Sequence, residues 1–267
     1  MNDATTDTRR APAADPGHRP VALITGVGRS AGLGAGIARA LAASGWDLAL
    51  ASWGAYDARM SWGESPADGP ALAEELEATG ARVVQAQEDL RDPGAAGRLF
   101  AAAAELGPVS ALVLSHCESV DSSLLDTDIE SFDRHFDVNA RASWLLVRAF
   151  AAQFPTQLHG SGRIVALTSD HTVGNLPYGA SKGALDRIVL AAARELGALG
   201  VSSNVVNPGP VDTGWMDDAT RAALAARQPG GRLGTPADVA GVVSFLLSPP
   251  GGWVNGQLLH ADGGFSA

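Results

Sequence analysis

The sequence of 267 residues is poor in cysteine, in positive charge and in long apolar runs. Its single cysteine, Cys117, excludes an intramolecular disulfide. Lysine and arginine total 19 against 29 acidic residues, and the net charge of −10 argues against a nucleic-acid partner, because affinity for phosphate backbones comes from clustered cations. No apolar run approaches the roughly 18 residues of a membrane-spanning helix. We therefore expect neither a nucleic-acid partner nor a membrane span.

Lysine and tyrosine are also rare in this sequence. The sequence holds one lysine, Lys182, and two tyrosines, one of which, Tyr178, lies four positions before that lysine. At this spacing two side chains share one face of a helix, one turn apart. Because the chain has no other lysine, the pair indicates a functional site rather than an ordinary solvated surface.

The chain divides into a short tail and one domain. Residues 1–19 are rich in Ala, Asp, Thr and Pro and lack the apolar core of a secretory signal, so they predict a flexible tail of a cytoplasmic protein. Residues 20–267 contain no linker and no internal repeat. With 46% hydrophobic residues overall, the chain is sufficient for one sizeable core.

Short apolar runs alternate with longer stretches of helical periodicity. The predicted strands are Val21–Thr25, Leu48–Ser52, Arg82–Ala86, Ala111–Ser115, Arg163–Thr168, Val201–Asn207 and Leu258–Ala261. The predicted helices are Leu33–Ser44, Pro70–Ala78, Pro93–Leu106, Ser131–Phe154, Tyr178–Leu199 and Pro236–Leu247. This alternation implies crossover connections and a parallel sheet covered on both faces. We predict a doubly wound α/β fold, a three-layer α/β/α sandwich in a single domain.

A glycine-rich turn connects the first predicted strand to an apolar helix. Gly26 permits the sharp turn, and Gly32 or Gly34 lets the backbone approach a pyrophosphate. The helix that begins near Leu33 offers free N–H groups and the positive end of its dipole to phosphates. Glycines alone would indicate only a flexible turn, but the strand before them and the helix after them predict a dinucleotide site.

The end of the second predicted strand bears on the choice of dinucleotide. An acidic residue there would bind the ribose 2′-hydroxyl of NAD, but the strand ends at Ser52 and the nearest carboxylate, Asp57, lies further along the loop. Arg29 and the Ser52 hydroxyl suit a 2′-phosphate, because an arginine fork matches phosphate geometry. We expect NADP(H) to be favoured, with NAD(H) as the alternative.

The Tyr178–Lys182 pair suits acid–base chemistry. A free phenol has a pKa of about 10 and is a poor catalyst at neutral pH. A nearby ammonium stabilises the phenolate and lowers that pKa, and the same ammonium can reach a ribose hydroxyl. We expect Tyr178 to transfer a proton and Lys182 to lower its pKa.

Further motifs accompany this pair. Y-G-A-S-K at 178–182 is similar to a Tyr-x-x-x-Lys motif, and N-V-V-N-P-G-P-V-D-T at 204–213 is similar to an Asn-x-x-x-Pro-Gly signature. E-D-L at 88–90, R-L-G-T-P at 232–236 and N-G-Q-L-L-H-A-D-G-G at 255–264 complete the pattern. Together they resemble the classical short-chain dehydrogenase/reductase family over residues 20–267, and most of all its 3-oxoacyl carrier-protein reductases and related ketoreductases.

The resemblance implies a Rossmann fold and an oxidoreductase that moves hydride between a nicotinamide dinucleotide and a carbonyl or secondary alcohol. Tyr178 would exchange a proton with the substrate oxygen, Lys182 would also hold the nicotinamide ribose, and Asn139 matches the proton-relay asparagine. The other implied cofactor contacts are Asp89 and Leu90 at the adenine, and Pro208, Gly209, Val211 and Thr213 at the nicotinamide.

Ser169 is the expected hydroxyl that polarises the substrate carbonyl, because it closes the fifth predicted strand at the carboxyl edge where open α/β sheets bind ligands. Thr168 or Thr172 is the alternative. His116 and His171 also follow strands, but a lone histidine there is more often a hydrogen-bonded structural residue than a catalytic one. No histidine or cysteine shows metal-site spacing, so no metal is expected.

Three features depart from the family pattern. Five residues separate Gly26 from Gly32 instead of three, which resembles divergent enoyl reductases, although those place six residues between Tyr and Lys. L-S-H-C at 114–117 replaces Asn-Asn-Ala-Gly, and Ser169 lies only nine residues before Tyr178. Enoyl reduction and a non-catalytic dinucleotide-binding sensor therefore remain as alternatives.

Trp215, with Met216, lies where the family has a mobile lid, and core packing is the alternative.

Two predicted helical stretches are apolar over more than the single stripe that covers a sheet. These stretches, Ala140–Phe154 and Ala184–Leu196, carry few polar side chains, and extended apolar surface marks an interface. Small residues would let helices of two subunits approach closely: Ala149, Ala151, Ala191 and Ala192. Family members commonly assemble through these helices, so we expect a homotetramer, with a dimer as the alternative.

Overall fold

The computed structural model describes residues 19–267, so the predicted N-terminal tail lies outside the described residues except for Arg19. The guanidinium of Arg19 donates to the carbonyl oxygens of Ala42 (2.8 Å) and Trp46 (3.2 Å). It also lies 3.4 Å from a carboxylate oxygen of the buried Asp47. The described part of the chain therefore begins with a residue that is held against the domain.

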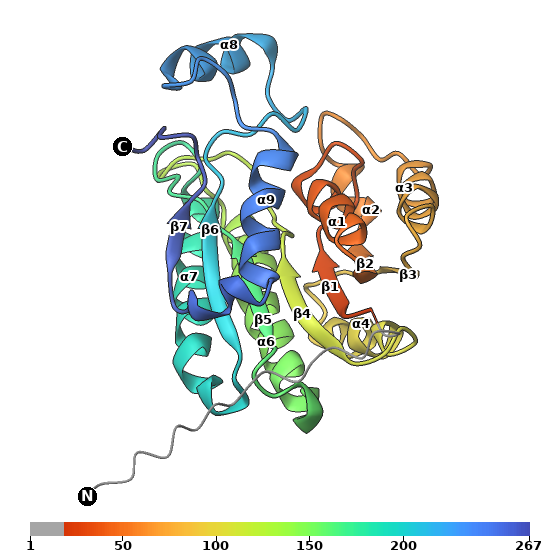
Figure 1. Cartoon of the computed structure of the whole chain (residues 1–267). Coiled ribbons are helices and arrows are strands. Elements are labelled where there is room, and N and C mark those ends of the chain that lie inside the picture. Colours follow the sequence, from red (N-terminus) through yellow and green to blue (C-terminus); the bar gives the residue numbers. More distant parts are fainter. Residues whose placement is uncertain (1–18) are drawn as a thin grey trace, which may run out of the picture.

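The sheet has seven parallel strands in the order β3-β2-β1-β4-β5-β6-β7 (Figure 1). Every predicted strand is present, and β1 (Val21–Thr25) shows why it is a continuous apolar run. Val21 and Leu23 pack into one core cluster, whereas Ala22 and Ile24 pack into the other, on the opposite face. The remaining strands are β2 (Asp47–Ser52), β3 (Val83–Gln87), β4 (Val109–Leu114), β5 (Arg163–Leu167), β6 (Ser202–Asn207) and β7 (Leu258–His260).

Helices cover both faces of the sheet, which confirms the three-layer prediction (Figure 1). One face is covered by α1 (Leu33–Ala43), α3 (Asp68–Glu77) and α9 (Pro236–Leu247). The other face is covered by α4 (Ala95–Ala103), α6 (Ala142–Gln153) and α7 (Leu176–Glu195). The neighbouring strands β1 and β4 are followed along the chain by strands on opposite sides, β2 and β5. The connections that leave their carboxyl ends therefore run in opposite directions, and a crevice forms between them.

The helix predicted over residues 131–154 is divided in the structure. It consists of α5 (Ile129–His135), a π-helical turn η1 (Phe136–Arg141) and α6, and Asn139 lies within the π-helical turn. Such turns occur frequently at functional sites. Hydrophobic periodicity does not reveal a single widened turn, so the sequence predicted one unbroken helix.

Two helices were not predicted, and both belong to long connections. They are α2 (Gly54–Asp57), a single turn after β2, and α8 (Asp218–Arg227), which lies beyond the carboxyl edge of the sheet (Figure 1). No side chain of α8 is buried, so it has no apolar stripe to detect. Three short 3₁₀ turns complete the fold: η2 (Thr156–Leu158), η3 (Gly197–Leu199) and η4 (Pro250–Trp253).

Ala192 does not lie on the free face of its helix, as its predicted role in assembly requires. Its side chain is 4% exposed and packs in the core cluster beneath α7, whereas the neighbouring Ala191 is exposed. The helical repeat turns Ala192 toward the sheet. Any contact between subunits through α7 therefore involves Ala191 and not Ala192.

A reciprocal cap starts α9. The Thr235 hydroxyl accepts the N–H of Asp238 (3.3 Å), and the Asp238 carboxylate accepts the N–H of Thr235 (2.8 Å). We expect Thr235→Ala to lower the free energy of unfolding by about 1 kcal/mol, because helix N–H groups lose their acceptor. Urea denaturation measures this change. The control is Thr156→Ala, at an exposed residue without a capping bond, which should change the free energy of unfolding by less than about 0.5 kcal/mol. Equal effects of the two variants would contradict the prediction.

Candidate active site

A cleft opens at the carboxyl edge of the sheet, between segments that follow β1, β2, β3, β4 and β6. Its far wall is formed by residues after β4, including Cys117 and Glu118. Eight of the predicted cofactor contacts line it: Gly26, Arg29, Gly32, Leu33, Ser52, Asp89, Leu90 and Thr213. The structure thus brings together residues that are almost 190 positions apart in sequence.

The glycine turn has the geometry that a dinucleotide needs. Gly26 has φ +75°, and a Cβ atom there would lie 2.6 Å from the backbone nitrogen of His116. A Cβ atom at Gly34 would lie 2.6 Å from the carbonyl oxygen of Gly26, so α1 packs directly on the turn. Gly32 starts α1 without any side-chain cap. The first N–H groups of this helix therefore have no intrahelical partner and face a glycine cradle that fits a pyrophosphate.

Arg29 spans the cleft from the glycine turn. Its Nη2 donates to the carbonyl oxygen of Thr213 (2.7 Å), and its guanidinium lies 4.4 Å from the centroid of the Trp62 ring. Trp62 also meets Trp215 edge to face, with ring centroids 5.0 Å apart. Trp215 is 42% exposed, so it belongs to the rim of the cleft and not to the core, whereas Met216 beside it is partly buried.

The structure brings Asp57 closer to the cofactor cleft than its position in the sequence indicated. Helix α2 folds the chain back, so that a Cβ atom at Gly28 would lie 2.5 Å from Asp57 Oδ2 and 3.9 Å from the Cβ of Ser52. The Asp57 side chain is buried and accepts a hydrogen bond from Trp62 Nε1 (2.9 Å). Sequence reasoning did not assign Asp57 to the site, because the single turn α2 was not predicted.

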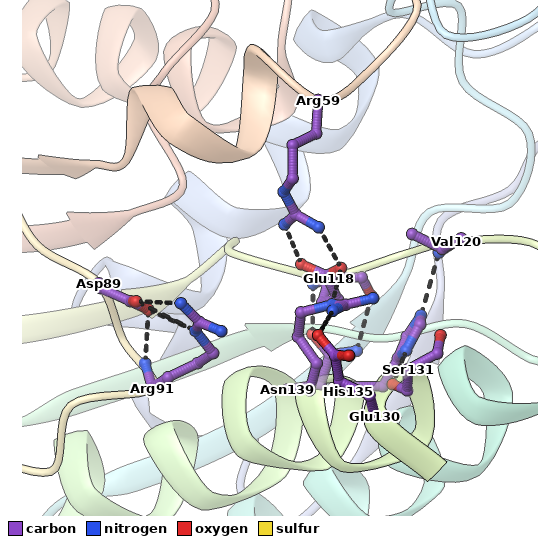
Figure 2. A network of polar contacts seen from close by, with 10 residues as sticks. Arg59, Asp89, Arg91, Glu118, Val120, Glu130, Ser131, His135 and Asn139 are labelled. Carbon is purple, nitrogen blue, oxygen red and sulfur yellow. Dashed lines mark hydrogen bonds and ion pairs between the residues drawn. The ribbon is translucent and has the colours of Figure 1, made fainter. Parts of the chain in front are cut away.

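The predicted adenine contacts lie after β3. Asp89 accepts hydrogen bonds from the backbone N–H of Arg91 (2.9 Å) and from its guanidinium (2.8 Å), as Figure 2 shows. Leu90 lines the cleft and packs against the core cluster beneath it. The two residues thus lie next to each other on the wall of the cleft.

Tyr178 and Lys182 lie one turn apart near the start of α7, as predicted. Lys182 is 2% exposed, and its Nζ donates to the carbonyl oxygens of Leu167 (2.9 Å) and His116 (3.5 Å). The same atom lies 5.8 Å from the centroid of the Tyr178 ring. The ammonium is therefore held by the carboxyl ends of two strands, beside the phenol.

The pKa of Tyr178 is shifted in the opposite direction from the expectation. Burial and the nearby Cys117 raise this pKa, and a hydrogen bond with the side chain of Ser169 lowers it by less. The ammonium of Lys182 donates to backbone carbonyl oxygens and is not among the causes of this shift. Burial thus outweighs any lowering of this pKa, and the role of Lys182 beside the phenol stays a prediction.

Asn139 connects the end of β4 to α7. From the π-helical turn its Oδ1 accepts the N–H of Glu118 (2.7 Å), and its Nδ2 donates to the carbonyl oxygen of Glu118 (2.9 Å) (Figure 2). The same Nδ2 donates to the hydroxyl of Ser181 (2.8 Å), between Tyr178 and Lys182 in sequence. The Asn139 side chain thus fixes the backbone that follows the divergent L-S-H-C stretch.

The two histidines have different environments. His116 is buried, with Nδ1 2.6 Å from the Thr25 hydroxyl and Nε2 3.1 Å from the carbonyl oxygen of Val138. Burial and then the charge of Lys182 lower the pKa of His116 to about 3, so it is neutral. His171 is exposed, and its ring lies 6.5 Å from the Tyr178 ring. His116 therefore has the environment of a structural residue.

The segment after β6 carries the predicted nicotinamide contacts. Gly209 has φ +60°, and a Cβ atom there would lie 2.4 Å from the Cβ of Asp262, so only glycine fits. Pro208 is also buried, and Val211 pairs with Gly234 in an isolated bridge that fixes the path of the chain toward Thr213.

Glu118 is a residue of the site that sequence reasoning missed. Its side chain is 1% exposed and forms an ion pair with Arg59 at 2.8 Å (Figure 2). A second ion pair, at 2.9 Å, joins it to Arg134 of α5. A buried carboxylate needs such partners. The only signal in the sequence is an acidic residue directly after the strand-end stretch, which does not reveal its partners.

Within residues 19–267, no three His, Cys, Asp or Glu side chains gather in a group able to bind a metal ion. In the same part of the chain, none of the helices has the length and hydropathy of a membrane-spanning helix.

Comparison with known proteins relates the chain to oxidoreductases along nearly all of its length. A family model described as enoyl-(acyl carrier protein) reductase matches residues 26–266. The uncharacterized oxidoreductase YjdA of Bacillus subtilis (strain 168) is 35% identical over 250 residues, which covers 92% of this chain and 96% of that protein. An NADPH-dependent aldehyde reductase-like protein of Arabidopsis thaliana is 33% identical over 261 residues, with 92% and 93% covered.

Solved structures agree with these relatives. A blue fluorescent protein from a metagenomic library, in complex with NADPH, has a TM-score of 0.83 at 35% identity and covers 94% of this chain and 99% of its own. A short-chain dehydrogenase from Burkholderia cenocepacia J2315, in complex with NADP, has a TM-score of 0.82 at 32% identity, with 94% and 99% covered. Family model, relatives and fold lead to one conclusion: the chain belongs to the short-chain dehydrogenase/reductase family and is an NAD(P)-dependent oxidoreductase.

Proposed function

We propose that this enzyme is an NADP-preferring ketoreductase in which Tyr178 protonates the substrate oxygen. The observation that carries the proposal is the environment of the Tyr178 phenol. It lies at the carboxyl edge of the sheet, near the Ser169 side chain and one helical turn from the only lysine. Burial keeps the phenol protonated, which suits the proton donor of a reduction.

Each of the four proposed catalytic residues has a distinct task. Tyr178 holds and delivers the proton, and the Ser169 hydroxyl polarises the substrate carbonyl. Lys182 provides fixed positive charge near the oxygen that gains negative charge. Asn139 keeps the backbone of Glu118 in register with α7 through its bonds to Glu118 and Ser181. Nicotinamide, when bound, supplies or accepts the hydride.

The cofactor is proposed to lie along the cleft, with its pyrophosphate on the glycine cradle. Arg29 and Ser52 favour the 2′-phosphate of NADP, while the carboxylate of Asp57 nearby opposes it. Relatives with NADPH in their names or structures support the preference. The residues proposed to hold the cofactor are Gly26, Arg29, Gly32, Leu33, Ser52, Asp89, Leu90, Tyr178, Lys182, Pro208, Gly209, Val211 and Thr213.

Enoyl reduction is the second candidate, because five residues separate Gly26 from Gly32 and the matching family model is described as an enoyl reductase. The spacing of Tyr178 and Lys182 favours ketoreduction instead. NADPH oxidation with a panel of carbonyl compounds, beside enoyl thioesters, separates the two candidates. Turnover with neither class would favour a dinucleotide-binding sensor.

We also propose a homotetramer. Trp144 of α6 is 46% exposed and Phe132 of α5 is 38% exposed, and Ala191 of α7, a helix that covers the same face of the sheet as α6, is exposed as well. Large exposed apolar side chains on a helical layer indicate a contact surface between subunits.

Replacement of Tyr178 by phenylalanine removes one hydroxyl and almost no volume. We expect Tyr178→Phe to lower kcat for carbonyl reduction about 10²- to 10⁴-fold, the usual contribution of a positioned proton donor. Steady-state NADPH oxidation measures the loss, and fluorescence titration of NADPH provides the control, since binding should stay nearly intact. Comparable turnover in the variant would refute the assignment.

Wild-type enzyme should prefer NADPH to NADH at least tenfold in kcat/KM, about 1.4 kcal/mol. Ser52→Asp should erode this preference, because a new carboxylate repels the 2′-phosphate. Asp57→Asn is the matched variant and should strengthen the preference for NADPH, because it removes a carboxylate next to Gly28. Equal use of both cofactors by the wild type would overturn the role of Arg29 and Ser52.

Light scattering at micromolar concentration should give the mass of a tetramer. Ala191→Glu on α7 should split the assembly, because it introduces charge into the proposed contact. Ala222→Glu on the exposed helix α8 is the control and should leave the mass unchanged. A monomeric wild-type mass contradicts the proposal.

A further inference from the structure

The imidazole of His116 lies where the ends of β1 and β4 meet the π-helical turn that contains Asn139. His116 belongs to the L-S-H-C stretch, which departs from the family pattern and has no task in the proposed steps. The residue is buried, and a Cβ atom at Gly26 would lie 2.6 Å from its backbone nitrogen. The backbone of His116 is therefore packed directly against the glycine turn.

The position of the hydrogen on the ring follows from its partners. Burial, followed by the charge of Lys182, lowers the pKa of His116 to about 3, so the ring is neutral and one nitrogen carries a hydrogen. Nε2 lies 3.1 Å from the carbonyl oxygen of Val138, which can only accept, so this hydrogen is on Nε2. Nδ1 then accepts from the Thr25 hydroxyl, 2.6 Å away. Both ring nitrogens thus have partners within the protein.

The bond to Val138 is made where the helix changes its hydrogen-bond register. The N–H of Ala142 bonds to the carbonyl oxygen of Asp137, five residues earlier, instead of four as in an α-helix. A turn widened in this way shifts the pairing of the backbone carbonyls that follow, and buried carbonyls need donors. The carbonyl oxygen of Val138, directly after Asp137, receives the Nε2–H of His116. His116 therefore provides a donor to the widened turn.

The next carbonyl of the turn is held by a neighbouring side chain. The Ser143 hydroxyl donates to the carbonyl oxygen of Asn139 (2.7 Å) and lies 3.3 Å from Nε2 of His116. The Asn139 amide extends from the same turn to Glu118, whose backbone N–H and carbonyl oxygen it binds at 2.7 and 2.9 Å (Figure 2). The backbone of the turn and the Asn139 side chain are thus fixed by separate partners.

We propose that His116 is a positioning residue whose hydrogen bond to Val138 keeps the π-helical turn widened and Asn139 in place. The ring does not take part in the proton transfer itself. It acts on the proposed reaction through Asn139, which joins Glu118 to the hydroxyl of Ser181 on the catalytic helix. The inference rests on the proposed ketoreductase function for its effect on turnover.

Two substitutions separate the two nitrogens of the ring. His116→Asn keeps an amide near the position of Nδ1 but does not reach Val138, whereas His116→Gln places an amide N–H near the position of Nε2. We expect kcat for carbonyl reduction to fall about 10- to 100-fold in His116→Asn, because catalytic groups tolerate little displacement, and to stay within about threefold of wild type in His116→Gln. Steady-state NADPH oxidation measures kcat, and fluorescence titration should give the wild-type affinity for NADPH in both variants.

Equal losses in the two His116 variants would overturn the proposal, because they would indicate a general loosening of the core. Weaker NADPH binding with unchanged kcat would also overturn it, and would assign the ring to the cofactor cleft.

A double-mutant cycle tests the route through Asn139. In an Asn139→Ala background, His116→Asn should lower kcat by less than about twofold further, because the group on which it acts is already absent. Losses that multiply as for independent sites would contradict this route.

Amide hydrogen exchange tests the proposal without turnover. The N–H of Glu118 is bonded to Asn139 Oδ1, and its exchange should accelerate at least about tenfold in His116→Asn but not in His116→Gln. Amides within β5 are the internal control and should keep their rates. An unchanged rate at Glu118 in His116→Asn would overturn the proposal. If the wild type reduces no carbonyl compound, the ketoreductase function fails, while exchange at Glu118 still decides the role of His116.

Thr25→Val provides a second approach if His116→Asn does not fold. It removes the hydroxyl that donates to Nδ1, and with it the preference for a hydrogen on Nε2. Exchange at Glu118 should then be faster than in Thr25→Ser, the matched variant that keeps the hydroxyl. Equal exchange in the two Thr25 variants would overturn the proposal.

Discussion

The site depends on how the carboxyl ends of β4 and β5 are joined to α7 by buried hydrogen bonds. Asn139 binds both backbone groups of Glu118 and the hydroxyl of Ser181, and Lys182 binds the carbonyl oxygens of His116 and Leu167. Burying these polar groups without partners would cost free energy, so their hydrogen bonds favour a single arrangement of the strand ends relative to α7. Tyr178 takes its position from this arrangement.

A second set of contacts determines the shape of the cleft that carries the glycine turn. The connection 53–67 is bound to the β4 end through Arg59 and Glu118, and it meets the segment after β6 through Trp62 and Trp215. Arg29 adds a hydrogen bond from the glycine turn to Thr213. The three contacts join segments that follow four different strands, β1, β2, β4 and β6, so the walls of the cleft are linked to one another.

Burial has opposite consequences for the two ionisable residues of α7. It raises the pKa of the Tyr178 phenol and lowers the pKa of the Lys182 ammonium, since in both cases the charged form loses its water. A protonated phenol is ready to give a proton. The same burial that stabilises the core around these residues therefore favours the neutral form of each side chain.

The sequence by itself determined the seven strands, their alternation with the main helices along the chain, and the pair Tyr178–Lys182, because hydrophobic periodicity and helical spacing are local properties of the chain. It did not reveal the π-helical turn around Asn139, because an extra residue in a single turn is too local a change for hydrophobic periodicity to detect. Nor did it reveal that Asp57 lies beside Gly28 or that Arg59 reaches Glu118. Only the tertiary structure decided these contacts and the raised pKa of Tyr178, because burial and ion pairing depend on residues that are distant in sequence and meet only when the crossovers have packed.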